Sequence, residues 1–155
     1  MSYYLRVFCK SDHKPNIKEA IAHINGLGHA FKVSVNLSEE DQTSGKWTDV
    51  ELTYKAGKMP ILIECNQIGD EDDIAREEIE EFVENIVPYG KFKEKDKIIA
   101  HLNATRYIIL SQLPLKDLDE DGYTTNKEFL KYVADYHQGI IHEEQEGFYD
   151  GKQVY

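Results

Sequence analysis

The chain has 155 residues, of which 41% are hydrophobic and 30% charged, which is the balance of one globular domain with its own core. Its net charge of −11, from 18 basic and 29 acidic residues, disfavours nucleic acids and anionic membranes as partners and favours cations and basic proteins. It has two cysteines, no apolar run near the ~20 residues that span a bilayer, and no secretory signal pattern at its start. We therefore expect a cytoplasmic protein without disulfides.

The first part of the chain predicts a strand, a helix and a second strand. Side chains alternate over residues 3–10 with the period of a strand. An apolar stripe over 17–24 predicts a helix that ends at Gly26, a suitable C-cap. An alternation over 31–36 predicts the second strand, and the polar stretch 38–45 predicts a loop. The core face of the first strand carries Tyr3, Leu5, Val7 and Cys9, and its outward face carries Tyr4, Arg6, Phe8 and Lys10.

A β-hairpin is predicted next, from apolar alternations at residues 47–54 and 61–66. Residues 55–58 form a four-residue loop between them, and the length of this loop sets which residues of the two strands face each other. The resulting register places Leu52 opposite Ile61, Val50 opposite Ile63 and Asp49 opposite Glu64.

The second half predicts three helices and three strands. An acidic first turn at 70–73 opens a helix that ends before Pro88, and another helix covers about residues 93–103. The continuous apolar run 107–110 predicts a strand buried on both faces. A stripe from Phe129 onward predicts the last helix. Further strands are predicted to begin at Ile140 and to flank an Asp-Gly turn at residues 150–151.

These elements predict an α+β protein, with residues 1–155 forming one compact domain in which helices back one continuous sheet. Residues 3–112 have the order of a ferredoxin-like βαββαβ module, which a further helix and strands extend. Segments 3–37 and 106–146 share the order strand, loop, helix, glycine, strand. This shared order predicts a structural duplication rather than a sequence repeat.

The acidic segment 117–128 has oxygen-bearing residues regularly spaced around Gly122. It resembles the calcium-binding loop of EF-hand proteins at the first, third, fifth, sixth and twelfth positions. Calcium takes about six to eight oxygen ligands, and a glycine permits the sharp turn that lets carboxylates converge on the ion. The resemblance implies calcium as a ligand, with Asp117, Asp119 and Asp121 binding it through their carboxylates, Tyr123 through its carbonyl, Thr125 directly or through water, and Glu128 as a bidentate carboxylate.

The same segment also has an explanation without a metal. Thr125 and Glu128 have the spacing of a capping box for the helix that follows them. The three aspartates would then belong to a solvated loop, with Gly122 serving its turn.

The outward face of the sheet is the second candidate site. In the predicted register Asp49 faces Glu64, and Glu51 lies two residues along on the same face. Like charges directly opposed destabilise a sheet unless cations compensate them. One interpretation is a charge-balanced, solvated face, and the other is a protein-binding surface with aromatic anchors. The residues of this candidate surface are Tyr4, Arg6, Phe8, Lys32, Trp47, Asp49, Glu51 and Glu64.

Apart from segment 117–128, no stretch matches a family signature. The charge favours a non-enzymatic cytosolic binding or regulatory protein that contacts a basic protein partner, for instance an immunity protein against a cationic toxin. The alternative is a small enzyme that uses the three carboxylates of the outward face or the thiol and imidazole of Cys9 and His13. Cys9 falls on the predicted core face, which favours inert packing. An enclosed pocket around the carboxylates would favour an enzyme, and an open charged face a binding protein.

Overall fold

The computed structural model describes residues 2–33, 38–44, 47–69, 73–86, 95–144 and 147–149. These residues form a seven-stranded sheet and five helices. The described elements, in chain order, are β1 (Ser2–Cys9), α1 (Ile17–Gly26), β2 (Lys32–Val33), α2 (Glu39–Ser44), β3 (Asp49–Thr53), β4 (Ile61–Gln67), α3 (Ile74–Ile86), α4 (Lys95–Asn103), β5 (Tyr107–Pro114), α5 (Glu120–Tyr136), β6 (Gly139–Glu143) and β7 (Gly147–Tyr149). None of these helices combines the length and the apolar character needed to cross a membrane.

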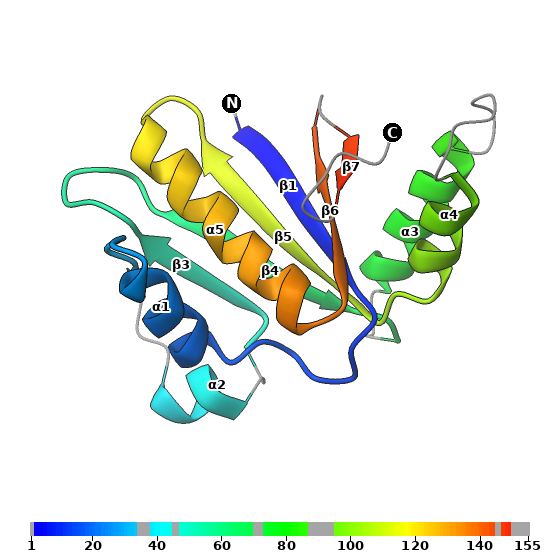
Figure 1. Ribbon diagram of the computed structural model, residues 1–155, viewed down its shortest axis with the longest axis horizontal. Coiled ribbons are helices and arrows are strands. Elements are labelled where there is room, and N and C mark those ends of the chain that lie inside the picture. The colour runs from blue at the N-terminus through cyan, green and yellow to red at the C-terminus, as the bar shows by residue number, and fades with distance from the viewer. Residues whose placement is uncertain are drawn as a thin grey trace.

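The strands lie in the order β2-β3-β4-β5-β1-β6-β7, and every neighbouring pair is antiparallel (Figure 1). The α+β class and the single sheet are therefore confirmed. The narrower ferredoxin-like description stays a prediction, as does the duplication of 3–37 in 106–146. In segment 106–146, one strand of the sheet lies between β5 and β6. In segment 3–37, by contrast, three strands lie between β1 and β2.

One face of the sheet, here called the first face, packs against α1 and α5. The alternation in β1 places Leu5, Val7 and Cys9 on this face, as predicted, and all three are fully buried. Helix α5 contributes Phe129, Leu130 and Val133 to the same core, and α1 contributes Ile17 and Ile24. This core is the larger of the two in the described chain.

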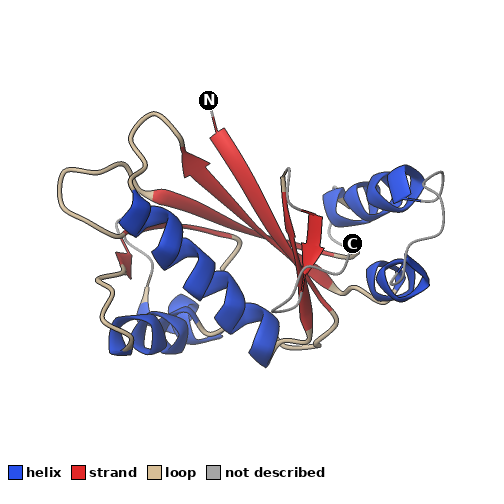
Figure 2. Ribbon diagram, turned by 45° about the horizontal axis from the view of Figure 1, so that its top comes forward, coloured by secondary structure: helices blue, strands red, loops and turns tan. Residues whose placement is uncertain are grey.

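The opposite face, here called the second face, carries a separate and smaller core under α3 and α4. In Figures 1 and 2 these two helices stand apart from α1, α2 and α5. Four strand residues at one end of the second face, Phe8, Ile108, Ile140 and Phe148, are buried there against Ala75, Ile79, Ile86, Ile98 and Leu102 of the helices. Because α3 and α4 cover only this end, the second face is divided into a covered and an open part.

Two predicted loops contain helices. The polar stretch 38–45 holds the short helix α2, and the last helix begins at Glu120 rather than near Phe129. The predictions for residues 34–37, for the acidic turn at 70–72 and for the Asp-Gly turn at 150–151 lie outside the described residues.

Candidate functional site

The hairpin register places the predicted carboxylates together on the second face of the sheet. Asp49 is paired with Glu64 and Val50 with Ile63, so the register predicted from the loop length is confirmed. The next row across the sheet pairs Glu51 with Leu62. Asp49 and Glu64 are exposed to solvent and Glu51 is half-buried, so this corner of the molecule presents three carboxylates.

The open part of the second face, here called the open face, continues from these carboxylates across β5 to β1. Glu64 is paired with Leu110, and Leu62 with Gln112. Gln112 in turn is paired with Tyr4 of β1. All of these residues are half-buried or exposed, because no described helix packs on this part of the sheet. The open face comprises Tyr4, Asp49, Glu51, Leu62, Glu64, Leu110 and Gln112.

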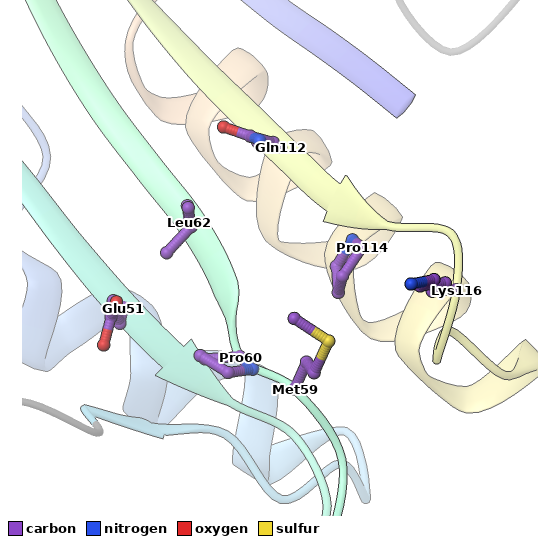
Figure 3. A pocket seen from close by; sticks show the side chains of 7 residues that line it. All are labelled: Glu51, Met59, Pro60, Leu62, Gln112, Pro114 and Lys116. Atoms are coloured by element: carbon purple, nitrogen blue, oxygen red, sulfur yellow. The ribbon is translucent and has the colours of Figure 1, made fainter. Parts of the chain in front are cut away.

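A groove of about 370 Å³ lies along one margin of the open face. Its lining residues are Glu51, Met59, Pro60, Leu62, Gln112, Pro114 and Lys116 (Figure 3). Apolar side chains occupy its middle, and Met59 remains 51% exposed there. Glu51 and Lys116 stand at opposite ends. The groove is therefore an apolar depression with a charge of opposite sign at each end.

Arg6 lies where the open face meets the covered part of the second face. Its Nε donates a hydrogen bond to Glu78 Oε1 of α3 at 2.8 Å, and its guanidinium lies 5.3 Å from the centre of the Phe82 ring. Arg6 is paired across the sheet with His142 of β6. Arg6 thus holds α3 on the sheet through Glu78 and Phe82.

His142 sits between two aromatic rings at this junction. Its ring centre lies 4.7 Å from those of Phe82 and Phe148, and its Nδ1 is buried without a hydrogen-bond partner among the described residues. Burial lowers the pKa of His142 to about 4, and the positive charge of Arg6 acts in the same direction. The imidazole is therefore neutral at pH 7.

Two predicted aromatic anchors are not available on the open face, and this part of the prediction is wrong. Phe8 is fully buried, because α3 and α4 cover the end of the second face on which it lies. Trp47 is 2% exposed, and its Nε1 donates a hydrogen bond to the carbonyl of Pro15 at 2.9 Å. Lys32 is exposed, but it lies on the edge strand β2, where it is paired with Thr53.

Helix α5 begins inside the acidic segment 117–128, at Glu120, the fourth residue of that segment. Asp119 is the N-cap, and its Oδ1 accepts a hydrogen bond from the amide of Gly122 at 2.9 Å. The capping box predicted from Thr125 is therefore wrong, since the N-cap lies six residues before Thr125. Gly122 is explained by packing, because a Cβ there would lie 2.5 Å from the Tyr54 ring.

The carboxylates of this segment face lysines of the β3–β4 turn. Lys55 Nζ lies 2.8 Å from Asp119 Oδ2 and 2.8 Å from Asp121 Oδ2. Asp117 accepts a hydrogen bond from the amide of Met59 at 2.6 Å and lies 3.5 Å from Lys58 Nζ. The hydrogen bonds from Lys55 and from the Gly122 amide hold the pKa of Asp119 below its ordinary value. The acidic segment thus holds the β3–β4 turn against the start of α5 through ion pairs and a hydrogen bond.

The other three implied calcium ligands lie within the helix. Tyr123 and Glu128 are half-buried helical residues, and the hydroxyl of buried Thr125 donates to the carbonyl of Asp121 at 2.7 Å. Over the described residues, no group of three His, Cys, Asp or Glu side chains is placed to hold a metal ion. Calcium binding stays a prediction, and an ion bound by Asp119 and Asp121 would have to displace Lys55.

A buried polar cluster, which the sequence did not reveal, joins α5 to the β1 and β6–β7 side of the sheet. Its centre is Glu143, whose side chain is 3% exposed. Glu143 Oε1 lies 2.8 Å from Lys127 Nζ, and Oε2 accepts hydrogen bonds from the hydroxyls of Tyr3 at 2.8 Å and Tyr123 at 2.5 Å. The Tyr149 hydroxyl donates to Oε1 at 3.2 Å and also contacts Lys127. Every oxygen of the carboxylate is thus hydrogen-bonded.

The electrostatics of this cluster favour a structural role over proton transfer. Burial acts to raise the pKa of Glu143, but hydrogen bonds from Lys127, Tyr123 and Tyr3 outweigh it and hold this pKa below its ordinary value. Burial and the bond to Glu143 raise the pKa of Tyr123 to about 12. Neither group titrates near neutral pH, where a general acid or base would need to. The alternation in β6, which puts Glu143 on the same face as Ile141, was the one available signal in the sequence.

The thiol of Cys9 is also unsuited to catalysis. Cys9 is fully buried, and burial, reinforced by the neighbouring Cys65, raises its pKa. His13 is exposed, and its backbone carbonyl accepts the hydroxyl of Tyr107 at 2.6 Å. A buried thiol with a raised pKa is packing material rather than a nucleophile.

Compared with known proteins, the chain matches no protein-family model, no curated protein and no solved structure.

Proposed function

We propose that this chain is a non-enzymatic cytoplasmic binding protein that docks a basic protein partner on its open face. The observation that carries the proposal is the position of three carboxylates, on Asp49, Glu51 and Glu64, beside the apolar groove that holds exposed Met59. Protein interfaces combine an apolar centre with a polar rim. Carboxylates in such a rim attract a basic partner and orient it.

The open geometry also favours binding over the alternative enzyme. The carboxylates of Asp49 and Glu64 are exposed on adjacent strands of the sheet instead of facing each other across an enclosed pocket. The enclosed carboxylate, Glu143, is saturated by hydrogen bonds, and the buried thiol of Cys9 has a raised pKa. Of the groups that the enzyme interpretation needs, Asp49 and Glu64 are thus exposed to bulk water, Glu51 is half-buried at the end of an open groove, and the thiol of Cys9 is buried.

The proposal can be tested without knowing the natural partner, with random peptides displayed on phage as the probe. The wild-type protein should enrich peptides whose binding is lost in the groove variants Leu62→Glu and Met59→Asp. Met59 is 51% exposed, so its replacement tests the surface even if Leu62→Glu proves hard to fold. Tyr136→Ala is the matched control, because Tyr136 is 64% exposed on α5 beyond the first face, away from the groove.

Loss of peptide binding in both groove variants, with full binding to Tyr136→Ala, supports the proposal. Enriched peptides that bind all three variants equally would place the binding surface elsewhere and overturn it. A selection that enriches no peptide at all would also count against an exposed binding face.

A further inference from the structure

The two ends of the groove differ in charge. Glu51 stands at one end, and on the same face lie Asp49, two residues away along β3, and Glu64, which is paired with Asp49. Lys116 stands at the other end (Figure 3), next to Asp117, whose carboxylate accepts a hydrogen bond from the Met59 amide and lies 3.5 Å from Lys58 Nζ. A bound segment therefore meets three carboxylates on one side, and on the other side Lys116 together with the paired charges of Asp117 and Lys58, so the groove distinguishes the two directions of a chain laid along it.

The floor of the groove cannot bind a segment by extending the sheet. Leu62 of β4 and Gln112 of β5 are register partners, so the two strands that form the floor already pair with each other. Recognition by strand addition needs an unpaired edge. The contacts available in the groove therefore come from side chains, so recognition depends on the charge and the apolar character of the bound side chains.

The middle of the groove suits apolar side chains. Its volume of about 370 Å³ is near the lower end of the roughly 300–1,000 Å³ that ligand pockets span. Met59 projects into it from the margin and stays 51% exposed, while Pro60, Leu62 and Pro114 form apolar walls. The flexible thioether of a methionine adapts to side chains of different shapes. The groove thus selects for apolar character more than for one particular residue.

We propose that the groove binds an extended segment of the partner protein, with an apolar side chain seated on Leu62 and Met59 and a lysine or arginine directed at Glu51. This inference rests on the proposed function and specifies its partner. A second copy of the chain could in principle pair its own Lys116 with Glu51. The copies would bring together two sets of the carboxylates of Asp49, Glu51 and Glu64 on chains of net charge −11, which opposes that contact.

Four synthetic peptides of glycine and serine test the inference as defined probes. One carries leucine and arginine a few residues apart, one leucine with glutamate in place of arginine, one leucine alone and one arginine alone. Affinities for the wild-type protein and three variants are measured by fluorescence anisotropy. The variants are Glu51→Lys, Lys116→Glu and Met59→Asp, and circular dichroism checks that each is folded.

The peptide with both leucine and arginine should bind the wild-type protein most tightly. Glu51→Lys should weaken the binding of this peptide by about tenfold, because a charge pair becomes a charge repulsion. The same substitution should strengthen the binding of the leucine–glutamate peptide, because a repulsion becomes a charge pair. Lys116→Glu leaves Glu51 in place and should not weaken the leucine–arginine peptide. Met59→Asp should weaken every peptide that contains leucine.

Equal affinity for the arginine and glutamate peptides, or an equal effect of Glu51→Lys on both, would overturn the inference. The proposed function would still stand if phage-selected peptides depended on Leu62 and Met59. Self-association of the wild-type protein in sedimentation experiments, lost in Met59→Asp, would show that a second copy occupies the groove and would also overturn it.

Discussion

Glu143 and Lys127 form an ion pair with 2.8 Å between Oε1 and Nζ, in which the carboxylate side chain is 3% exposed and the ammonium side chain 31%. Replacing Lys127 with methionine keeps most of the aliphatic packing and removes the charge. The buried carboxylate then loses its cation, and breaking such a pair typically costs about 3 kcal/mol of unfolding free energy, or somewhat less here because Lys127 is partly exposed.

Urea unfolding of Lys127→Met measures this loss. Arg76→Met is the matched control, because Arg76 is exposed and forms an ion pair at 2.7 Å with Asp73, which precedes α3. We expect a much smaller change in the control, since exposed pairs contribute little. Equal effects of the two substitutions would mean that the cluster around Glu143 does not depend on its cation.

Asp119 is expected to stabilise the protein as a helix cap and as a partner of Lys55. Asp119→Ala removes the hydrogen bond to the Gly122 amide as well as one contact of Lys55, so the melting temperature in EDTA should fall by about 3 °C. Asp121→Ala removes only a contact of Lys55 and should have a smaller effect. A loss caused by Asp119→Ala that appears only when calcium is added would instead assign Asp119 to a metal site.

His142 should make the stability depend on pH. Its pKa is about 4 in the folded protein and ordinarily 6.5, so between these values the unfolded chain binds a proton that the folded protein does not. Unfolding free energy should therefore fall as the pH falls from about 6.5 toward 4. The groups that act on this imidazole include the cation Arg6 and the anion Glu143.

His142→Phe keeps an aromatic ring between Phe82 and Phe148 and removes the titration. The slope of unfolding free energy between pH 6.5 and 5, above the range in which most carboxylates titrate, should become shallower than in the wild-type protein. His23→Phe, which changes an exposed histidine on α1, serves as the control and should leave the slope in place. An unchanged slope in His142→Phe would show that His142 is already protonated, or already solvated, in the folded protein.

Local rules predicted the parts of the fold that depend on short stretches of chain. The four-residue turn at 55–58 sufficed to give the register of β3 and β4, because a hairpin of that length allows few alternatives. The alternation in β1 also placed Cys9 correctly. The same alternation could not show that Phe8 is buried, because its burial depends on where α3 and α4, far along the chain, pack on the second face.

Long-range contacts explain the features that the sequence did not reveal. The sequence offered a capping box at Thr125, but α5 is capped by Asp119, and the contacts of this earlier start with Lys55 and Tyr54 stabilise it. The cluster around Glu143 draws its partners from β1, α5 and β7. No spacing rule connects residues so far apart. The groove likewise appears only once β4 and β5 are side by side, since Leu62 and Gln112 are register partners.

The pair formed by Asp49 and Glu64 supplies a last prediction, on the cost of placing like charges opposite each other. These residues are register partners on adjacent antiparallel strands, and both are exposed. Glu64→Lys should raise the unfolding free energy by roughly 0.5 kcal/mol, because it turns a cross-strand repulsion into an attraction. The gain should shrink in high salt, which screens exposed charges.

A double-mutant cycle separates this pairwise effect from the general benefit of lowering the negative charge of the protein. Asp49→Lys alone should stabilise the protein much as Glu64→Lys does. The double variant places two lysines opposite each other and should lose most of that gain, although it reduces the negative charge further. Urea unfolding at low salt gives the four free energies.

Additive gains in the double variant would mean that the two carboxylates do not interact. A clear loss of stability in Glu64→Lys would mean that Glu64 has a favourable partner on the open face. Either result would require the charge distribution of the proposed binding surface to be redrawn.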